Sequence, residues 1–258
     1  MSKVRTLILR APGTNCDPET KYAFEQAGSS VDLAHVNELL RKKRPLSDYH
    51  IMVIPGGFTY GDDIASGRIL ANELRAGLTD AMREFTAQGG LILGICNGFQ
   101  VLVKSGILPG DATPVTLTHN DSGRFECRWV HLKADPSSPC VFTRGIDMMY
   151  LPVAHGEGKF VADADKVRTA LSYCDGAGDT SAGYPHNPNG SAANIAGICD
   201  ATGRVFGLMP HPERFIRRTQ HPRWTRERSD KPGDGMGIFE NAVGWARRGY
   251  SPTGKSTG

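Results

Sequence analysis

Short apolar runs alternate with amphipathic stretches through the first half of the chain. The runs with the length and composition of buried strands are residues 4–9, 31–35, 51–54 and 91–95. Helical spacing of apolar residues, with Asp-Pro or Gly signals at the ends, predicts helices over residues 17–28, 74–88 and 97–104. Strands separated by helix-length segments favour right-handed crossovers, so we predict an open, mostly parallel α/β sheet with helices on both faces.

The pattern changes beyond Gly110. Residues 125–133 alternate as a strand does, residues 153–161 and 194–198 are further strand candidates, and residues 205–209 form a last short apolar run. Loops rich in Gly, Pro and Asn separate these segments, notably residues 175–190. We therefore expect a single domain over residues 1–248, followed by a polar, flexible tail over residues 249–258.

Composition and charge narrow the class of protein. The chain has 258 residues, 39 % of them hydrophobic, which is enough for a substantial core. The formal net charge is only +3, with acids and bases mixed, whereas nucleic-acid binders concentrate basic charge. No run approaches the ~20 apolar residues of a membrane helix, and the first ten residues lack an export-signal pattern. We expect a cytoplasmic protein that binds neither nucleic acid nor membrane.

The six cysteines include no C-x-x-C pair. Scattered cysteines in such a chain are usually small buried hydrophobic residues, so a catalytic cysteine must be identified by its context. Cys96 has that context, because an apolar strand precedes Gly94-Ile-Cys96-Asn-Gly98 and a predicted helix follows. This is the nucleophile-elbow pattern with cysteine in place of serine, and its tight turn requires small residues two before and two after the nucleophile. The following helix N-terminus favours a thiolate. The alternative is a core cysteine flanked by glycines.

A thiolate that attacks an amide carbon creates an oxyanion, which needs preorganised donors. In elbow enzymes one donor is the backbone N–H after the nucleophile, here Asn97. The second comes from a loop at the end of a neighbouring strand, and Gly57 in Pro55-Gly-Gly57 fits this role. By itself Pro-Gly-Gly is also compatible with a plain turn.

The apolar run at 205–209 leads into Pro-His211-Pro-Glu213. Each proline excludes the helical region for the residue before it, so an extended chain is expected here. His211 and Glu213, two apart, would then point the same way. A carboxylate beside an imidazole fixes its tautomer and stabilises its cation, as a base serving a thiolate requires. The alternative is a structural histidine near a strand end.

Three motifs, PGG, GICNG and PHPER, occur in the order found in the triad (class I) glutamine amidotransferases, whose sheet is flavodoxin-like. Longer segments narrow the resemblance: PGGFTYGDDIASGRILA (55–71), GICNGFQVLVKSGILPG (94–110), NDSGRFECRW (120–129), PVAHGEGKF (152–160), NPNGS (187–191) and GLMPHPER (207–214). These segments are similar to the glutaminase part of phosphoribosylformylglycinamidine synthase, an enzyme of purine synthesis. The resemblance covers residues 4–247 and implies hydrolysis of L-glutamine to glutamate and ammonia.

The resemblance also implies roles for individual residues. Cys96 would be the nucleophile, His211 the general base and then acid, and Glu213 its orienting carboxylate. Gly57 and Asn97 would supply the oxyanion hole. The residues that would bind the glutamine substrate are Gln100, His155, Gly156 and Glu157.

The resemblance further implies partners and cofactors. Ammonia would pass to a large ATP-dependent synthase subunit, in a complex that also contains a small accessory subunit. ATP and magnesium would belong to the synthase, so this chain is expected to carry no cofactor and no metal. Two other interpretations stay open at this stage: an elbow-cysteine enzyme with another substrate, such as a peptidase or another amidotransferase, and a catalytically inactive binding or scaffold module.

Three further features are set aside. Residues 249–256 fit the phosphate-loop pattern, but that motif requires a preceding strand and a following helix. The arginine-rich segment 214–228 is either a solvated face or a docking surface for the synthase. Asp62-Asp63 lacks a third oxygen ligand at a recognised spacing, and helix capping explains one of these acids.

Overall fold

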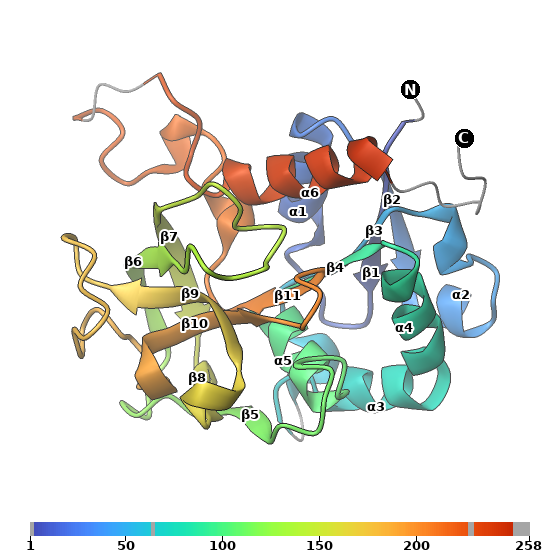
Figure 1. Cartoon of the computed structure of the whole chain (residues 1–258), viewed down its shortest axis with the longest axis horizontal. Helices are drawn as coiled ribbons and strands as arrows, with labels where there is room; N and C mark the ends of the chain where they lie inside the picture. Colours follow the sequence, from blue (N-terminus) through green and yellow to red (C-terminus); the bar gives the residue numbers. More distant parts are fainter. Residues whose placement is uncertain (1–2, 63–64, 227–229, 250–258) are drawn as a thin grey trace.

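The computed structural model describes residues 3–62, 65–226 and 230–249 of the chain (Figure 1). The predicted tail beyond Gly249 and most of the phosphate-loop-like segment lie outside the described residues, as do Asp63 and the end of the arginine-rich segment. In the described residues, the main sheet has nine strands in the order β2-β1-β3-β4-β11-β10-β9-β6-β7.

Five neighbouring strands of this sheet run parallel. They are β2 (Ser30–His35), β1 (Arg5–Arg10), β3 (Ile51–Ile54), β4 (Leu91–Ile95) and β11 (Val205–Leu208). Strands β3, β4 and β11 are buried along their whole length, which is why they appear in the sequence as continuous apolar runs. The predicted α/β class with a largely parallel sheet is confirmed.

The remaining strands pair antiparallel. They are β10 (Ile195–Cys199), β9 (Arg168–Cys174), β6 (Glu126–Ala134) and β7 (Met148–His155). A separate two-stranded sheet joins β5 (Val115–Thr118) and β8 (Lys159–Ala162). The sheet is therefore mixed, with a parallel half that carries the predicted motifs and an antiparallel half that extends it.

Helices lie on both sides of the parallel half (Figure 1). The α-helices are α1 (Asp17–Gln26), α2 (Val36–Leu40), α3 (Arg68–Gly77), α4 (Thr79–Ala87), α5 (Asn97–Lys104) and α6 (Met236–Gly249). Short 3₁₀ helices are η1 (Leu46–Asp48), η2 (Thr59–Asp62), η3 (Ala164–Lys166), η4 (Ala192–Asn194), η5 (Pro212–Arg214) and η6 (Arg218–Gln220). On one side, α1 and α6 pack through an edge-to-face contact between Phe24 and Phe239, with ring centroids 5.0 Å apart. On the other side lie α3 and α5.

Two predicted elements were wrong in their extent. The helix predicted over residues 74–88 is two helices, α3 and α4, which meet at Leu78, where the backbone leaves helical geometry (φ −131°, ψ −7°). The strand predicted over residues 153–161 is divided between β7 and β8, because residues 156–158 form a break between the two strands. Asn120 bonds to both sides of this break: its backbone N–H donates to Gly156 O, and its side-chain oxygen accepts from the Gly158 N–H.

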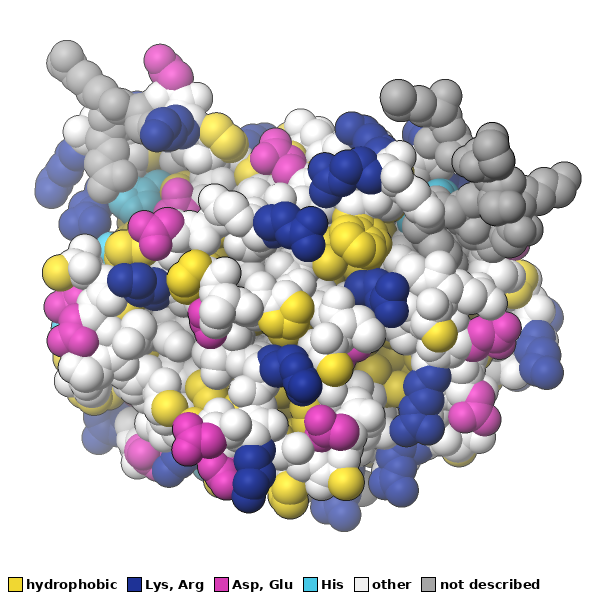
Figure 2. All heavy atoms as spheres, in the orientation of Figure 1, with side chains coloured by type: hydrophobic (Ala, Val, Ile, Leu, Met, Phe, Trp, Pro, Cys, Tyr) yellow, Lys and Arg dark blue, Asp and Glu magenta, His cyan; other side chains and the backbone are white. Residues whose placement is uncertain are grey.

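The surface charge bears on the expectation of no nucleic-acid binding, and the helices bear on the expectation of no membrane span. Figure 2 shows basic and acidic side chains interspersed over the visible face of the molecule. Among the described residues, no helix combines the length and the apolar character needed to cross a membrane.

Candidate active site

The carboxyl ends of four neighbouring parallel strands meet at one edge of the sheet. The segments that follow β1, β3, β4 and β11 bring Cys16, Gly57, Cys96 and His211 to this edge. The register aligns Ile95 with Leu208, and the Cys96 N–H donates to Leu208 O at 2.8 Å. Ligands in open α/β sheets bind outside the carboxyl ends of the strands, so this edge is the expected place for a site.

Cys96 lies on a strained turn between β4 and α5. Its backbone angles are φ 51° and ψ −105°, a conformation that a non-glycine residue adopts only when its surroundings enforce it. A Cβ on Gly98 would lie 1.8 Å from Ile54 O, and one on Gly94 would lie 2.7 Å from Gly98 O. The requirement for small residues on both sides of Cys96, predicted from the elbow pattern, is confirmed.

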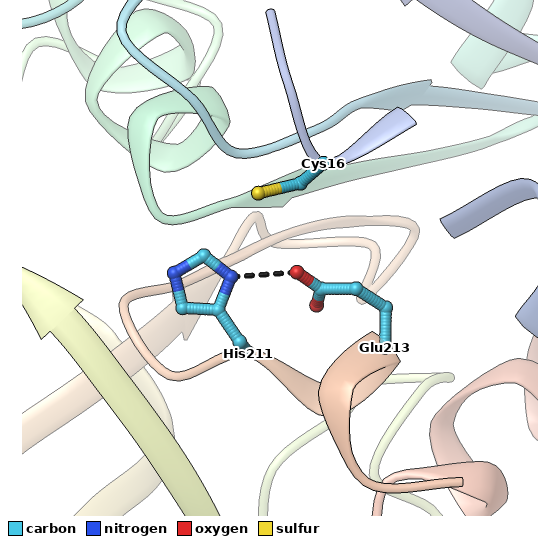
Figure 3. Close-up of side chains that lie close together, drawn as sticks. All are labelled: Cys16, His211 and Glu213. Carbon is cyan, nitrogen blue, oxygen red and sulfur yellow. Dashed lines mark hydrogen bonds and ion pairs between the residues drawn. The ribbon is translucent and has the colours of Figure 1, made fainter. Parts of the chain in front are cut away.

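His211 is held by strand β7 and by Glu213. Its backbone N–H donates to Pro152 O on β7 at 2.9 Å, and its Nδ1 lies 2.6 Å from Glu213 Oε1. The chain is not extended through Glu213 as predicted, because Pro212 and Glu213 belong to the 3₁₀ helix η5. The pairing of the two side chains is nevertheless present, since one 3₁₀ turn folds the carboxylate back onto the ring. Figure 3 shows this contact.

The electrostatics of this pair favour a protonated imidazole. Burial opposes the charge on His211, but Glu213 and the two nearby thiols, Cys96 and Cys16, outweigh it and raise the pKa of His211 well above its usual range. With Nδ1 committed to Glu213, the second ring nitrogen, Nε2, is buried without a hydrogen-bond partner among the described residues. Nε2 is therefore the nitrogen available for proton exchange with Cys96 or with a bound molecule.

A pocket of about 450 Å³ opens above this edge. Seven of the nine residues predicted for the site line it: Gly57, Cys96, Gln100, His155, Gly156, Glu157 and His211. The other two are buried close by: Glu213 lies behind His211, and Asn97 follows Cys96 at the start of α5. The structure thus brings together residues that come from four separate segments of the chain.

Two of the four residues predicted to bind a substrate, Gln100 and Glu157, also hold each other. The Gln100 side-chain N–H donates to Glu157 O, and its oxygen accepts from the Asn97 side chain at 3.2 Å. Glu157 Oε2 accepts from the Ser66 N–H at 3.4 Å and lies 3.9 Å from Lys104 Nζ. These bonds fix the floor of the pocket and leave the Glu157 carboxylate at its lining.

His155 is a neutral residue in this site. Its Nδ1 lies 3.1 Å from Asn120 Oδ1, while its Nε2 is buried with no hydrogen-bond partner among the described residues. Burial, assisted by the charge of His211, lowers the pKa of His155 to about 4. His155 therefore stays uncharged at neutral pH and offers shape and a hydrogen-bonding nitrogen rather than charge.

The two backbone positions predicted for an oxyanion hole flank Cys96. Gly57 has φ +144°, and a Cβ there would lie 2.8 Å from Asn15 N and 2.9 Å from Gly13 O, so only glycine fits. Asn97 is the first residue of α5, and its side-chain oxygen accepts from Thr59 Oγ1 at 2.6 Å. Thr59 follows Gly57 by two residues, so this bond ties the two loops together at the pocket edge.

The structure adds residues to which the sequence motifs assigned no role. Those lining the same pocket are Asn15, Cys16, Phe58, Ser66, His119, Phe125, Ala154 and Arg214. Asn15 and Cys16 follow β1, as Gly57 follows β3, so the rule that sites form at strand carboxyl ends could have pointed to them. Arg214 is the last residue of the PHPER motif. Phe125 lies just before β6 and is 54 % exposed.

The pocket lining therefore contains two cysteines, Cys16 and Cys96, either of which could be the nucleophile. Cys16 is 1 % exposed; its thiol donates to Asn15 Oδ1 at 3.3 Å and accepts from Arg214 Nη2 at 3.1 Å. Cys96 is 7 % exposed and stands on the elbow with the N-terminus of α5 beneath it. Its sulfur donates a long hydrogen bond, 3.8 Å, to Ala154 O. The geometry favours Cys96, because it is more exposed than Cys16 and stands at the N-terminus of α5.

Comparison with known proteins defines the family to which this chain belongs. The family model described as a CobB/CobQ-like glutamine amidotransferase domain matches residues 3–246. The chain therefore belongs to this family of glutamine amidotransferases. A relative named phosphoribosylformylglycinamidine synthase subunit PurQ, from Dehalococcoides mccartyi, is 57 % identical over 254 residues, covering 96 % of this chain and 100 % of the relative.

Further comparisons, with a second relative and with two solved structures, agree with this family and its fold. A protein of the same name from Methanococcus maripaludis is 43 % identical over 262 residues, covering 93 % of this chain and 96 % of the relative. A chain in the structure of PurLQS from Thermotoga maritima superposes with a TM-score of 0.74 at 31 % identity, covering 95 % of this chain and 99 % of that one. A glutamine amidotransferase from the same organism shares the fold alone, with a TM-score of 0.58 at 18 % identity.

Proposed function

We propose that this chain is the glutaminase subunit of a phosphoribosylformylglycinamidine synthase and supplies ammonia for purine biosynthesis. The observation that carries the proposal is the shared pocket in which the elbow cysteine, Cys96, lies beside the buried His211–Glu213 pair. The names of the full-length relatives identify the complex. The pocket and the residue behind it supply the catalytic groups: Cys96, His211 and Glu213.

The reaction proceeds in two halves. The Cys96 thiolate attacks the carboxamide carbon of glutamine, and the carbonyl electrons move onto oxygen. When the tetrahedral intermediate collapses, the C–N bond breaks and His211 gives its proton to the departing nitrogen, which leaves as ammonia. Water, deprotonated by His211, then attacks the glutamyl thioester. Glutamate leaves, and the Cys96 thiolate and the His211 cation are restored.

The neighbouring residues would position the substrate. The backbone N–H groups of Gly57 and Asn97 would stabilise the oxyanion, in support of which their loops meet through the Thr59–Asn97 hydrogen bond. Gln100, His155, Gly156 and Glu157 would bind the rest of the glutamine. The Glu157 carboxylate at the pocket lining suits an α-ammonium group.

The partners and the location follow from this function. We propose that ammonia passes to a large synthase subunit, which would hold ATP and magnesium, and that a small accessory subunit completes the complex. The arginine-rich segment around Arg218 is one candidate docking surface. We also propose a cytoplasmic location, supported by six free cysteines, which suit a reducing compartment.

The test is reconstitution of the complex. We expect the isolated chain to hydrolyse glutamine slowly, and the rate to rise roughly tenfold or more when the synthase and accessory subunits bind, because partner binding completes the catalytic arrangement. Glutamine-dependent synthesis of the amidine product should appear only in the mixture. A chain that hydrolyses another amide or a peptide faster than glutamine would contradict the proposal.

Glu213→Gln should strongly reduce turnover. The amide keeps the volume of the side chain but removes the charge that stabilises the His211 cation, so the pKa of His211 should fall. We expect kcat to drop by about 10³- to 10⁴-fold, as for the equivalent change in a serine-protease triad. Steady-state kinetics measure the first effect and NMR titration of the imidazole the second. Glu19→Gln, which removes a partner of Arg214 near the surface, is the control and should change kcat less than about twofold.

A further inference from the structure

A second thiol lies beside the His211–Glu213 pair and takes no part in the proposed reaction. The Cys16 sulfur, a ring nitrogen of His211 and a carboxylate oxygen of Glu213 all lie within 4.8 Å of one another, and the three side chains are buried. Figure 3 shows the Cys16 sulfur directed at the imidazole, with the carboxylate beside the same ring. Thiolate, imidazole and carboxylate are the ligands that Zn²⁺ prefers in proteins.

The Glu213 carboxylate has an oxygen that can bind a cation. Glu213 Oε1 accepts from His211, but Glu213 Oε2 is buried with no hydrogen-bond partner among the described residues, and the whole residue is 0 % exposed. A buried anionic oxygen without a donor is costly, and a metal ion would satisfy it. This orphaned oxygen is an observation independent of the clustering of the three donors.

The backbones of Cys16 and His211 are held by hydrogen bonds, whereas the Arg214 guanidinium, which contacts the same sulfur, can move. The Cys16 N–H donates to Gly56 O at 3.2 Å, and the His211 N–H donates to Pro152 O. Arg214 also contacts the Cys16 sulfur, but its side chain is 38 % exposed and lies 3.8 Å from Glu19. Arg214 can therefore turn toward Glu19 and solvent and leave the sulfur to a metal.

A route from solvent to the cluster exists. Cys16, His211 and Arg214 all line the pocket of about 450 Å³ that also contains Cys96. Zinc–ligand distances are about 2.0–2.3 Å, so donors around a tetrahedral ion lie roughly 3.3–3.8 Å apart. Donors separated by at most 4.8 Å reach this spacing through small side-chain rotations.

We propose that Cys16, His211 and Glu213 form a binding site for a thiophilic divalent cation such as Zn²⁺, and that its occupancy stops the glutaminase reaction. Each of the three side chains shares an electron pair with the ion, which keeps its +2 state, and the protons of the thiol and of the bound ring nitrogen leave to solvent. His211 and Glu213 then no longer serve Cys96. The ion is an inhibitor and adds nothing to the reaction. The inhibition rests on the proposed function, whereas metal binding does not.

Binding is tested with metal-free full-length protein, Zn²⁺ and a competing chromophoric chelator. We expect the unaltered chain and Cys96→Ala to bind Zn²⁺ with equal affinity, and Cys16→Ala to bind about 100-fold more weakly or worse, because it lacks one ligand. Mg²⁺, which prefers oxygen ligands, should not compete. Cys199→Ala, which removes a thiol next to Cys140, is the control and should bind as the unaltered chain does.

Two results would overturn the site: absence of zinc binding by the unaltered chain, or loss of binding in Cys96→Ala with retention in Cys16→Ala. The second result would place the ion on the nucleophile. Cys16→Ser provides a second variant if Cys16→Ala does not fold, as judged by circular dichroism, and it should also lose most of its affinity because a hydroxyl is a poor zinc ligand.

Inhibition is measured separately as glutamine hydrolysis with and without Zn²⁺. Activity of the unaltered chain should fall with zinc and return when chelator is added, and Cys16→Ala should need about 100-fold more zinc for half-inhibition of its own zinc-free rate. Equal zinc sensitivity of the two proteins would contradict the inhibitory mechanism. If the metal-free chain hydrolyses no glutamine even with its partners, the proposed function fails, and the binding titration still decides the metal site.

Discussion

Replacing Cys96 with alanine should abolish glutamine hydrolysis while leaving the fold and the assembly of the complex intact. Removal of a triad nucleophile lowers turnover by roughly 10⁵-fold or more, since the remaining groups cannot form the covalent intermediate. The synthase partner should still make product from added ammonium, because only the supply of ammonia is lost. Ammonia release and ammonium-dependent synthesis, measured on the same reconstituted complex, check the two halves of this prediction.

Cys127→Ala is the matched control, because Cys127 is an exposed thiol on β6 outside the pocket lining. Its activity should equal that of the unaltered chain. Covalent labelling by a glutamine-like electrophile separates the two pocket thiols: mass spectrometry should find the label on Cys96, and Cys16→Ala should still be labelled. A label on Cys16, or full hydrolysis by Cys96→Ala, would show that the wrong sulfur has been assigned.

Gly98→Ala should have the largest effect on stability. A Cβ at this position would lie 1.8 Å from Ile54 O, a backbone atom at the end of β3, so α5 must shift away from the sheet. Overpacking typically costs about 1–3 kcal/mol, and a clash with a backbone atom lies at or above the upper end of this range. For a chain of this size that corresponds to a decrease of roughly 10 °C or more in the unfolding midpoint. The shift also displaces Cys96, so activity should be lost below the melting temperature.

Gly183→Ala is the control for this change. A Cβ there meets no atom within 4 Å and its φ is not positive, so the substitution should move the midpoint by less than about 2 °C. Thermal unfolding followed by circular dichroism measures both variants. Equal midpoints for Gly98→Ala and Gly183→Ala would show that the turn has room to spare, and would remove the physical reason for reading G-x-C-x-G as an elbow.

The sequence alone predicted the parallel half of the fold and the central chemistry. β3, β4 and α5 occur at the predicted bounds, because a continuous apolar run between Gly and Pro signals has few alternatives to a buried strand. Cys96 was identifiable because its turn imposes a local requirement, small residues at fixed spacing, that is visible in the letters. Each of these features depends on neighbours along the chain.

The antiparallel half was predicted less well. The sequence pattern predicts neither β5 nor β9, and the predicted strand 153–161 joins the end of β7 to the start of β8. The ends of these strands are decided by partners elsewhere in the chain. The break between β7 and β8 depends on Asn120, which is remote in sequence and bonds to both sides of it. No local pattern contains this information.

The sequence by itself determined that a strained cysteine turn and a histidine–glutamate pair exist. Only the tertiary structure decided that they share a pocket, because the sheet order places β11 beside β4 although a large part of the chain separates them. The same order brings Cys16, which belongs to no motif, beside His211 and into contact with Arg214. Contacts between strand ends are set by the pairing of whole strands, and that pairing is decided by the burial of the entire sheet rather than by the residues at the site.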